Sequence, residues 1–167
     1  MNNPNLTVPL DVAQSNYVLP PSLALTAYSA IGQFSDTVTP LQEAMFAAAI
    51  ANGGTLMKPY LVQQVTASDL STVLTTPQAI LNQPVSSSVA SSVGQMMRAV
   101  MQDSNGTGFA FNSQAVGGIV IAGKTGTAET GQNSGLDDAA FTSFAARSKL
   151  TKQSLCAAAA SNILALL

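Results

Sequence analysis

Residues 117–129 read GGIVIAGKTGTAE, and this stretch predicts the strand around which the chain is organised. Two glycines open it, and residues 119–122 (IVIA) form a short apolar run of β type before Gly123. Alternate residues of a strand share a face, so Lys124 and Gly126 should point one way and Thr125 and Thr127 the other.

The four residues that end this run carry the chemistry. Lys124 supplies a compact positive charge, Thr125 a hydroxyl, and Gly126 lets a ligand approach the backbone. Lys-Thr-Gly is also the third element of the serine penicillin-recognising enzymes, beside Ser-x-x-Lys and Ser-Asp-Asn. Alone, the match indicates little, because threonine is an ordinary β-former; we interpret Glu129 as an exposed strand end.

Composition excludes several classes of function. Charged residues make up 8% of the chain, against roughly 25% in typical soluble domains. The six Lys and Arg are scattered singly and the net charge is −2, so there is no basic stripe for nucleic acid. With no histidine and one cysteine, Cys156, the sequence has no Cys/His metal site, no Ser-His pair and no internal disulfide. We expect neither a metal nor a cofactor.

Two observations bear on membrane attachment. Residues 1–10 carry neither a positive start nor an apolar core, as a signal peptide would. Residues 153–167 are free of charge, but they are shorter than the roughly 20 residues that span a bilayer. We therefore expect any membrane anchor to lie outside this chain.

The first part of the chain predicts one confident helix. Prolines and asparagines make residues 1–35 irregular, with a short helical turn near residues 22–28. Residues 40–52 predict a buried helix, because Thr39 and Gln42 form a capping box with proline at the first helical position. Asn52-Gly53-Gly54 suits a left-handed cap at its end.

Residues 55–65 alternate loosely and should pair with residues 71–75 as a hairpin, with residues 77–84 as a connector. A second helix is predicted over residues 86–102, and residues 103–106 stop it. Its expected core face carries methionines as packing residues and consists of Val89, Val93, Met96, Met97 and Val100.

The remaining segments predict a turn, a strand and a helical tail. We interpret Gly106-Thr107-Gly108 as a helix-terminating turn rather than a ligand contact. Residues 139–145 predict a second strand, and the alanine-rich residues 155–167 predict a helix.

Three segments in a fixed order carry a resemblance. They are residues 31–62 (IGQFSDTVTPLQEAMFAAAIANGGTLMKPYLV), the methionine-bearing helix with its GTG, and residues 120–129 (VIAGKTGTAE). Together they resemble the C-terminal part of the transpeptidase domain of class B penicillin-binding proteins, nearest the actinobacterial type. The likeness covers residues 8–129, and more loosely extends to residue 145.

The resemblance implies an α/β fold, in which an antiparallel sheet is flanked by helices, present here as an incomplete serine-transpeptidase or β-lactamase-like domain. Residues 1–167 would be the C-terminal part of that domain, with residues 1–35 as an irregular lead-in and residues 147–167 as an atypical tail.

The resemblance also implies acyl transfer, in which a serine attacks a D-Ala carbonyl of a peptidoglycan stem peptide and an acceptor amine then takes the acyl group. Lys124 would add positive potential, and Thr127 would donate its N–H to the oxyanion. Thr125 would bind the terminal carboxylate of substrate or β-lactam, beside Gly126. Stem peptides and β-lactams are the expected partners, with cell-division or elongation proteins as further candidates, at the extracytoplasmic face of the bacterial membrane.

The sequence departs from this family in two ways. It contains no Ser-x-x-Lys and no Ser-x-Asn, and Thr55-Leu56-Met57-Lys58 is the nearest spacing to the first. We therefore expect the chain to be a fragment that is inactive alone. Ala139-Ala140-Phe141 stands where the family has Ala-Trp-Phe, and polar residues 148–154 replace an aliphatic strand, which should expose a sheet edge.

Two other interpretations stay open. One is a truncated, non-catalytic pseudoenzyme or structural module. The other is a β-lactam sensor or β-lactamase of the same superfamily, which would need the absent serine motif as well.

Overall fold

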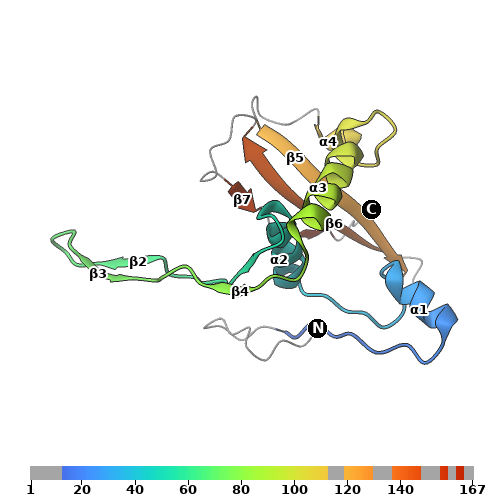
Figure 1. The fold of residues 1–167 in the computed structure, drawn as a ribbon, viewed down its shortest axis with the longest axis horizontal. Coiled ribbons are helices and arrows are strands. Elements are labelled where there is room, and N and C mark those ends of the chain that lie inside the picture. Colours follow the sequence, from blue (N-terminus) through green and yellow to red (C-terminus); the bar gives the residue numbers. More distant parts are fainter. Residues whose placement is uncertain (1–12, 113–118, 130–136, 148–154, 158–160, 164–167) are drawn as a thin grey trace.

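Two helices, α2 (Pro40–Ala51) and α3 (Ser87–Gln102), pack against an antiparallel sheet built on β5 (Ile119–Glu129) and β6 (Asp137–Arg147) (Figure 1). The computed structural model describes residues 13–112, 119–129, 137–147, 155–157 and 161–163. Within them, α3 contacts β5 and α2 contacts β6. The predicted class, a mixed fold with helices on an antiparallel sheet, is confirmed.

The sheet is centred on the long pairing of β5 with β6. The register runs without a break from Ile119 opposite Arg147 to Glu129 opposite Asp137. β5 lies within its predicted range of residues 117–129, whereas β6 extends two residues beyond each end of its predicted range of 139–145. The longer β6 follows from the ladder, in which hydrogen bonds to β5 continue along both strands.

The other edge of β6 is covered by two short strands from the tail. β7 (Leu155–Ala157) pairs with β6 at Phe144 to Ala146, and β8 (Ser161–Ile163) pairs with it at Ala139 to Phe141. The predicted helix over residues 155–167 is therefore wrong where the structure describes that segment. Strand pairing satisfies backbone groups of β6 that a helix would leave open, so the expected bare edge is instead partly covered.

Helix α2 begins as its sequence predicts. The Thr39 hydroxyl accepts from the Gln42 N–H at 3.2 Å, and Pro40 is the first helical residue. The Thr39 N–H donates to the Ser15 hydroxyl at 3.0 Å. In the predicted capping box, the Gln42 side chain was the expected acceptor of this N–H. At the other end Gly53 and Gly54 adopt φ of +63° and +92°, which confirms the left-handed ending.

Helix α3 starts at a Ser86 cap, whose hydroxyl accepts from the Val89 N–H at 3.3 Å, and it ends at Asp103. Its buried residues are Ala90, Met97 and Met101, whereas Val89 and Met96 are 47% and 60% exposed. The predicted core face is thus wrong at these two positions.

The side chains of α3 that do reach the sheet include Met97, which packs with Ala122 of β5 and Phe144 of β6, with Val93 beside them. A second core cluster joins Met45 and Ala49 of α2 to Leu56. The packing role expected of the methionines is confirmed for Met97 and wrong for Met96.

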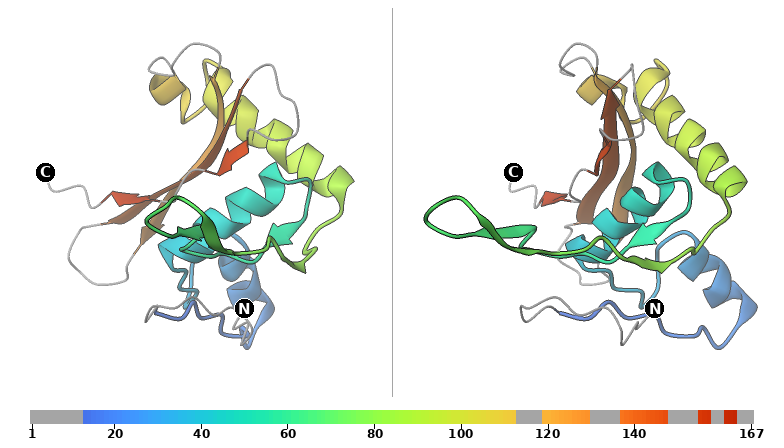
Figure 2. Two further views of the ribbon diagram at one scale, coloured as in Figure 1. Left: turned by 90° about the vertical axis from the view of Figure 1, so that its left-hand side faces the viewer. Right: turned by 60° about the vertical axis from the view of Figure 1, so that its left-hand side comes forward.

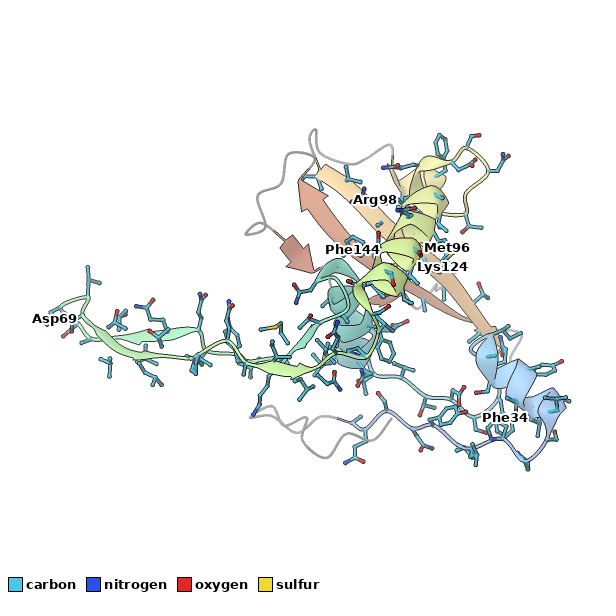
Figure 3. All side chains as sticks on the ribbon, viewed as in Figure 1. Phe34, Asp69, Met96, Arg98, Lys124 and Phe144 are labelled. Atoms are coloured by element: carbon cyan, nitrogen blue, oxygen red, sulfur yellow. The ribbon has the colours of Figure 1, made fainter. Side chains whose placement is uncertain are left out.

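A slender arm projects from this body (Figures 1 and 2). At its base β1 (Leu56–Met57) pairs with β4 (Ile80–Asn82), and further out β2 (Gln64–Thr66) pairs with β3 (Thr72–Thr75). The predicted hairpin is confirmed, although its first strand is split in two and the predicted connector contains β4. Every residue of β2 and β3 is exposed, and Asp69 lies at the tip, far from Lys124 (Figure 3).

The lead-in contains a helix where a short turn was predicted. Helix α1 (Leu23–Ala30) starts at Ser22, whose hydroxyl accepts from the Leu25 N–H at 3.3 Å. The first twelve residues lie outside the described part. Across the ranges that the structure describes, no helix is both long and apolar enough to cross a bilayer.

Candidate functional site

The predicted site residues Lys124, Thr125, Gly126 and Thr127 lie together in the second half of β5, which confirms the predicted strand. Directly opposite them on β6 are Thr142, Phe141, Ala140 and Ala139. Because the register is unbroken, side chains of β5 alternate between the two faces.

The alternation fixes which packing supports each site residue. Ala122 is fully buried against Met97 of α3, so the even-numbered face of β5, which includes Lys124, is the one turned toward the helices. Thr125 lies on the opposite face with Gly123 and is half-buried, whereas Lys124 and Thr127 are exposed.

The carbonyls of Thr125 and Thr127 both accept from groups that do not belong to β6. Lys124 Nζ donates to the Thr125 carbonyl, and Gln33 Nε2 donates to the Thr127 carbonyl at 3.4 Å. In an antiparallel ladder, the N–H and C=O of one residue point to the same side, and successive residues alternate. The Thr125 and Thr127 N–H groups therefore face the edge of β5 away from β6, where the described residues place no other strand.

A residue that the sequence reasoning left out of the site, Thr107, contacts it directly. Its Oγ1 lies 2.7 Å from Thr125 Oγ1, and either hydroxyl can be the donor. The GTG that contains Thr107 does follow the end of α3, as predicted, but the turn also brings its hydroxyl to the strand. The paired glycines around a threonine were the only signal in the sequence.

The backbone on both sides of Thr107 is tightly constrained. A Cβ on Gly106 would lie 2.2 Å from the Val100 carbonyl oxygen, and one on Gly108 would lie 2.4 Å from Met101 Sδ. The Gly106 N–H donates to the Asp103 carbonyl at 2.8 Å, and the Gly108 N–H donates to that of Val100 at 3.1 Å. At Gly106 the backbone of α3 leaves no room for a Cβ, and at Gly108 a Cβ would have to displace the buried Met101 side chain, so the turn is held against the end of α3.

An aromatic contact supports the strand from the Thr125 face. The Phe141 ring lies 6.0 Å, centroid to centroid, from that of Phe111 in α4 (Phe109–Asn112). Its edge fills the space beside Gly123, where a Cβ would come within 2.8 Å of the ring. Phe141 thus occupies the space that a side chain at Gly123 would need.

One carboxyl group is perturbed near the helix–sheet contact. Burial raises the pKa of Glu43 on α2, above its ordinary value of 4.5. The Thr142 hydroxyl, opposite Lys124 in register, donates to the Glu43 backbone carbonyl at 3.4 Å.

The structure places no nucleophile–lysine pair at the nearest sequence match. Leu56 and Met57, between Thr55 and Lys58, form β1, and the Lys58 N–H donates to the Ala79 carbonyl at 2.8 Å. Side chains three apart on extended backbone point to opposite faces, so Thr55 and Lys58 do not form a pair. Over the described ranges, no group of three His, Cys, Asp or Glu side chains could hold a metal ion. The structure describes only the backbone of Glu129.

The chain is similar in sequence to known penicillin-binding proteins. The family model described as "Penicillin binding protein transpeptidase domain" matches residues 9–159. Peptidoglycan D,D-transpeptidase PbpA of Mycolicibacterium smegmatis is 39% identical over 131 residues, which are 78% of this chain and 26% of that protein. PbpA of Mycobacterium tuberculosis is 37% identical over the same length and the same shares.

Solved structures agree with these sequence matches. The crystal structure of PBPA from Mycobacterium tuberculosis superposes with a TM-score of 0.74 at 35% identity, over 87% of this chain and 34% of that one. The penicillin G acyl-enzyme complex of penicillin-binding protein A from M. tuberculosis gives 0.70 at 35% identity, over 86% and 31% of the two chains. This chain therefore spans about a quarter of the length of the curated relatives it matches.

Proposed function

The chain belongs to the penicillin-binding protein transpeptidase domain family, and from this premise we propose that it is part of a peptidoglycan D,D-transpeptidase. In this proposal, residues 1–167 are the C-terminal part of the transpeptidase domain, and β5 is the wall along which substrate binds. The observation that carries it is the position of Lys124, Thr125, Gly126 and Thr127 on one strand whose outer edge is open within the described residues.

Each residue of the wall has a role that suits its chemistry. Thr125 donates its hydroxyl to the terminal carboxylate of a stem peptide or of a β-lactam, and Lys124 adds positive potential close by. Gly126 has no side chain to separate the ligand from the backbone. The Thr127 N–H, which faces the open edge, donates to the oxyanion of the tetrahedral intermediate.

The reaction that this wall serves is serine acyl transfer. A serine oxygen attacks the carbonyl of the penultimate D-Ala, the terminal D-Ala leaves, and an acceptor amine then takes the acyl group from the serine. A preorganised oxyanion donor such as the Thr127 N–H is typically worth about 3 kcal/mol of barrier. The 167 residues contain no Ser-x-x-Lys, so the chain alone is expected to form no acyl bond. The setting is the extracytoplasmic face of the bacterial membrane, with division or elongation proteins as candidate partners.

The test is labelling with a fluorescent penicillin. The purified 167-residue chain is run beside a version extended upstream through its coding sequence, and beside the extended version with Thr125→Val. We expect label only on the extended chains, with slower labelling of the Thr125→Val variant because the carboxylate has lost a donor. Label on the 167-residue chain itself would contradict the expectation that this chain alone forms no acyl bond. A nucleophile outside the Ser-x-x-Lys motif would then have to be found.

The absence of the serine motif from the 167 residues favours a second candidate, a truncated and non-catalytic module. The coding sequence upstream separates the two: Ser-x-x-Lys followed by Ser-x-Asn supports the transpeptidase, and their absence supports the module. A sensor or β-lactamase of the same superfamily would instead show labelling of the extended chain without stem-peptide cross-linking.

A further inference from the structure

We propose that Thr107 is a positioning residue for the carboxylate-binding hydroxyl of Thr125. The inference deepens the proposed function and rests on its assignment of Thr125 to a carboxylate. It starts from the 2.7 Å contact between the two hydroxyl oxygens, one from the turn after α3 and the other from β5.

The direction of this hydrogen bond follows from proton counting. A hydroxyl has one proton and can accept from other donors at the same time. When Thr125 donates its proton to a carboxylate, it has none left for Thr107, so Thr107 must be the donor in their contact. The chain then runs from Thr107 to Thr125 to the carboxylate, and each bond polarises the next.

The turn around Thr107 is built to hold this donor in place. Gly106 and Gly108 each sit where a Cβ would come within 2.4 Å of another atom, and both N–H groups are bonded to carbonyls of residues 100–103. Met101, which contacts the Gly108 position, is fully buried. Thr107 itself is exposed, so packing of its own side chain does not explain the rigidity of its backbone.

The Thr107 bond also restricts the rotation of the Thr125 side chain. A threonine hydroxyl on a strand can occupy more than one staggered χ1 rotamer. A fixed donor at 2.7 Å favours the rotamer that keeps Oγ1 beside Thr107. The same oxygen is then already oriented before a ligand arrives, which reduces the entropy lost on binding.

The experiment uses the 167-residue chain with isotope labels, and it compares wild type with Thr107→Val, Thr107→Ser and an exposed-threonine control, Thr75→Val on the arm. Three-bond couplings report the χ1 rotamer of Thr125. Titration with N-acetyl-D-alanyl-D-alanine, and separately with its C-terminal carboxamide, reports affinity through the amide shifts of Thr125 to Thr127.

We expect Thr107→Val to average the Thr125 rotamer and to weaken binding of the carboxylate probe about fivefold, the effect of one typical hydrogen bond. Binding of the carboxamide should be unchanged, whereas a merely structural defect would weaken both probes equally. Thr107→Ser, which keeps the hydroxyl, should restore both readouts, and Thr75→Val should match wild type.

Several results would overturn the inference. They are an unchanged Thr125 rotamer in Thr107→Val, equal losses for the two probes, and no preference of the wild-type chain for the carboxylate. A fixed rotamer with weakened carboxylate binding would replace it by direct contact between Thr107 and ligand. Penicillin labelling of the extended chain is independent of these readouts, so failure of the proposed function is recognised separately.

Discussion

Two glycines of β5, three positions apart, differ in their tolerance of a side chain. A Cβ on Gly123 would come within 2.8 Å of the Phe141 ring and 3.0 Å of the Ser143 Cβ, and Gly123 is buried. We expect Gly123→Ala to destabilise the chain by about 1–3 kcal/mol, the usual effect of overpacking a close-packed site. Urea denaturation monitored by circular dichroism measures this change.

Gly126 is the matched control for that substitution. A Cβ there would meet the Ala140 Cβ at 3.5 Å, which is ordinary van der Waals contact. Gly126→Ala should therefore leave the free energy of unfolding within about 0.5 kcal/mol of wild type, as is usual for substitutions away from close contacts. Equal destabilisation by the two alanines would show that the Phe141 ring does not constrain Gly123.

The carboxyl of Glu43 makes stability depend on pH. Because burial raises its pKa in the folded state, the folded chain holds this proton more tightly than the unfolded chain does. The linkage sign then requires stability to fall as pH rises from the ordinary value of 4.5 through the raised folded value.

Substitution of Glu43 isolates this contribution. Glu43→Gln, which cannot ionise, should be more stable relative to wild type at pH 7 than at pH 4. Thermal unfolding of both chains at the two pH values makes the comparison. A difference between wild type and Glu43→Gln that is the same at both pH values would contradict the prediction.

The sequence predicts the strand that carries the candidate site but not the residues that support this strand. Lys124 to Thr127 are contiguous, so a local motif was sufficient to propose them as site residues and to place them on a strand. Thr107 and Gln33 contact the same strand only because the chain folds back on itself. A hydroxyl or an amide in a loop has no periodicity that would indicate such a contact.

Among the elements, the arm contains a non-glycine residue in the left-handed backbone conformation, which a side chain disfavours. Leu70, at the turn between β2 and β3, has φ of +66°, and the residue is 83% exposed. The left-handed conformation costs a non-glycine residue roughly 1–2 kcal/mol. We expect Leu70→Gly to stabilise the arm by about 1 kcal/mol, since no packing of the leucine is lost.

Amide exchange of β2 and β3 measures the stability of the arm directly. Protection at Val65 and Leu74, which are opposite each other, should increase in Leu70→Gly and in Leu70→Asn, because asparagine also tolerates this conformation. Val73→Gly, where φ is ordinary, should lower protection instead. Reduced protection in Leu70→Gly would mean that the leucine side chain stabilises the arm through a contact of its own.

The predictability of each element follows from how local its determinants are. The cap at Thr39 and the glycines after α2 are set within a few residues, and their predictions are confirmed. The face of α3 depends on where the sheet lies, so the apolar pattern alone placed Val89 and Met96 wrongly in the core. The alanine-rich residues 155–167 favour a helix locally, but the described residues 155–157 and 161–163 pair with the edge of β6 and form strands.

The two edges of the sheet differ in what covers them. The outer edge of β5 carries the candidate site, and two of its carbonyls accept from Lys124 and Gln33. The far edge of β6 is instead paired in two halves, by β7 near Ala145 and by β8 near Ala140. An unpaired edge is a template for association with other chains, so the tail should protect the molecule from aggregation.

Two truncations separate the roles of β7 and β8. A chain that ends at Ala157 keeps β7 and loses β8, whereas a chain that ends at Arg147 loses both. In the first, amide exchange should rise about five- to tenfold near Ala139 to Phe141 only, as expected for hydrogen bonds worth about 1 kcal/mol each. In the second, amide exchange should also rise near Phe144 to Ala146, and light scattering should show association.

The position of the change in exchange is decisive, because a tail that stabilised the chain only through general packing would change exchange across β6 equally in both truncations. A shortest chain that stays monomeric, with exchange unchanged along β6, would show that the tail strands do not protect this edge.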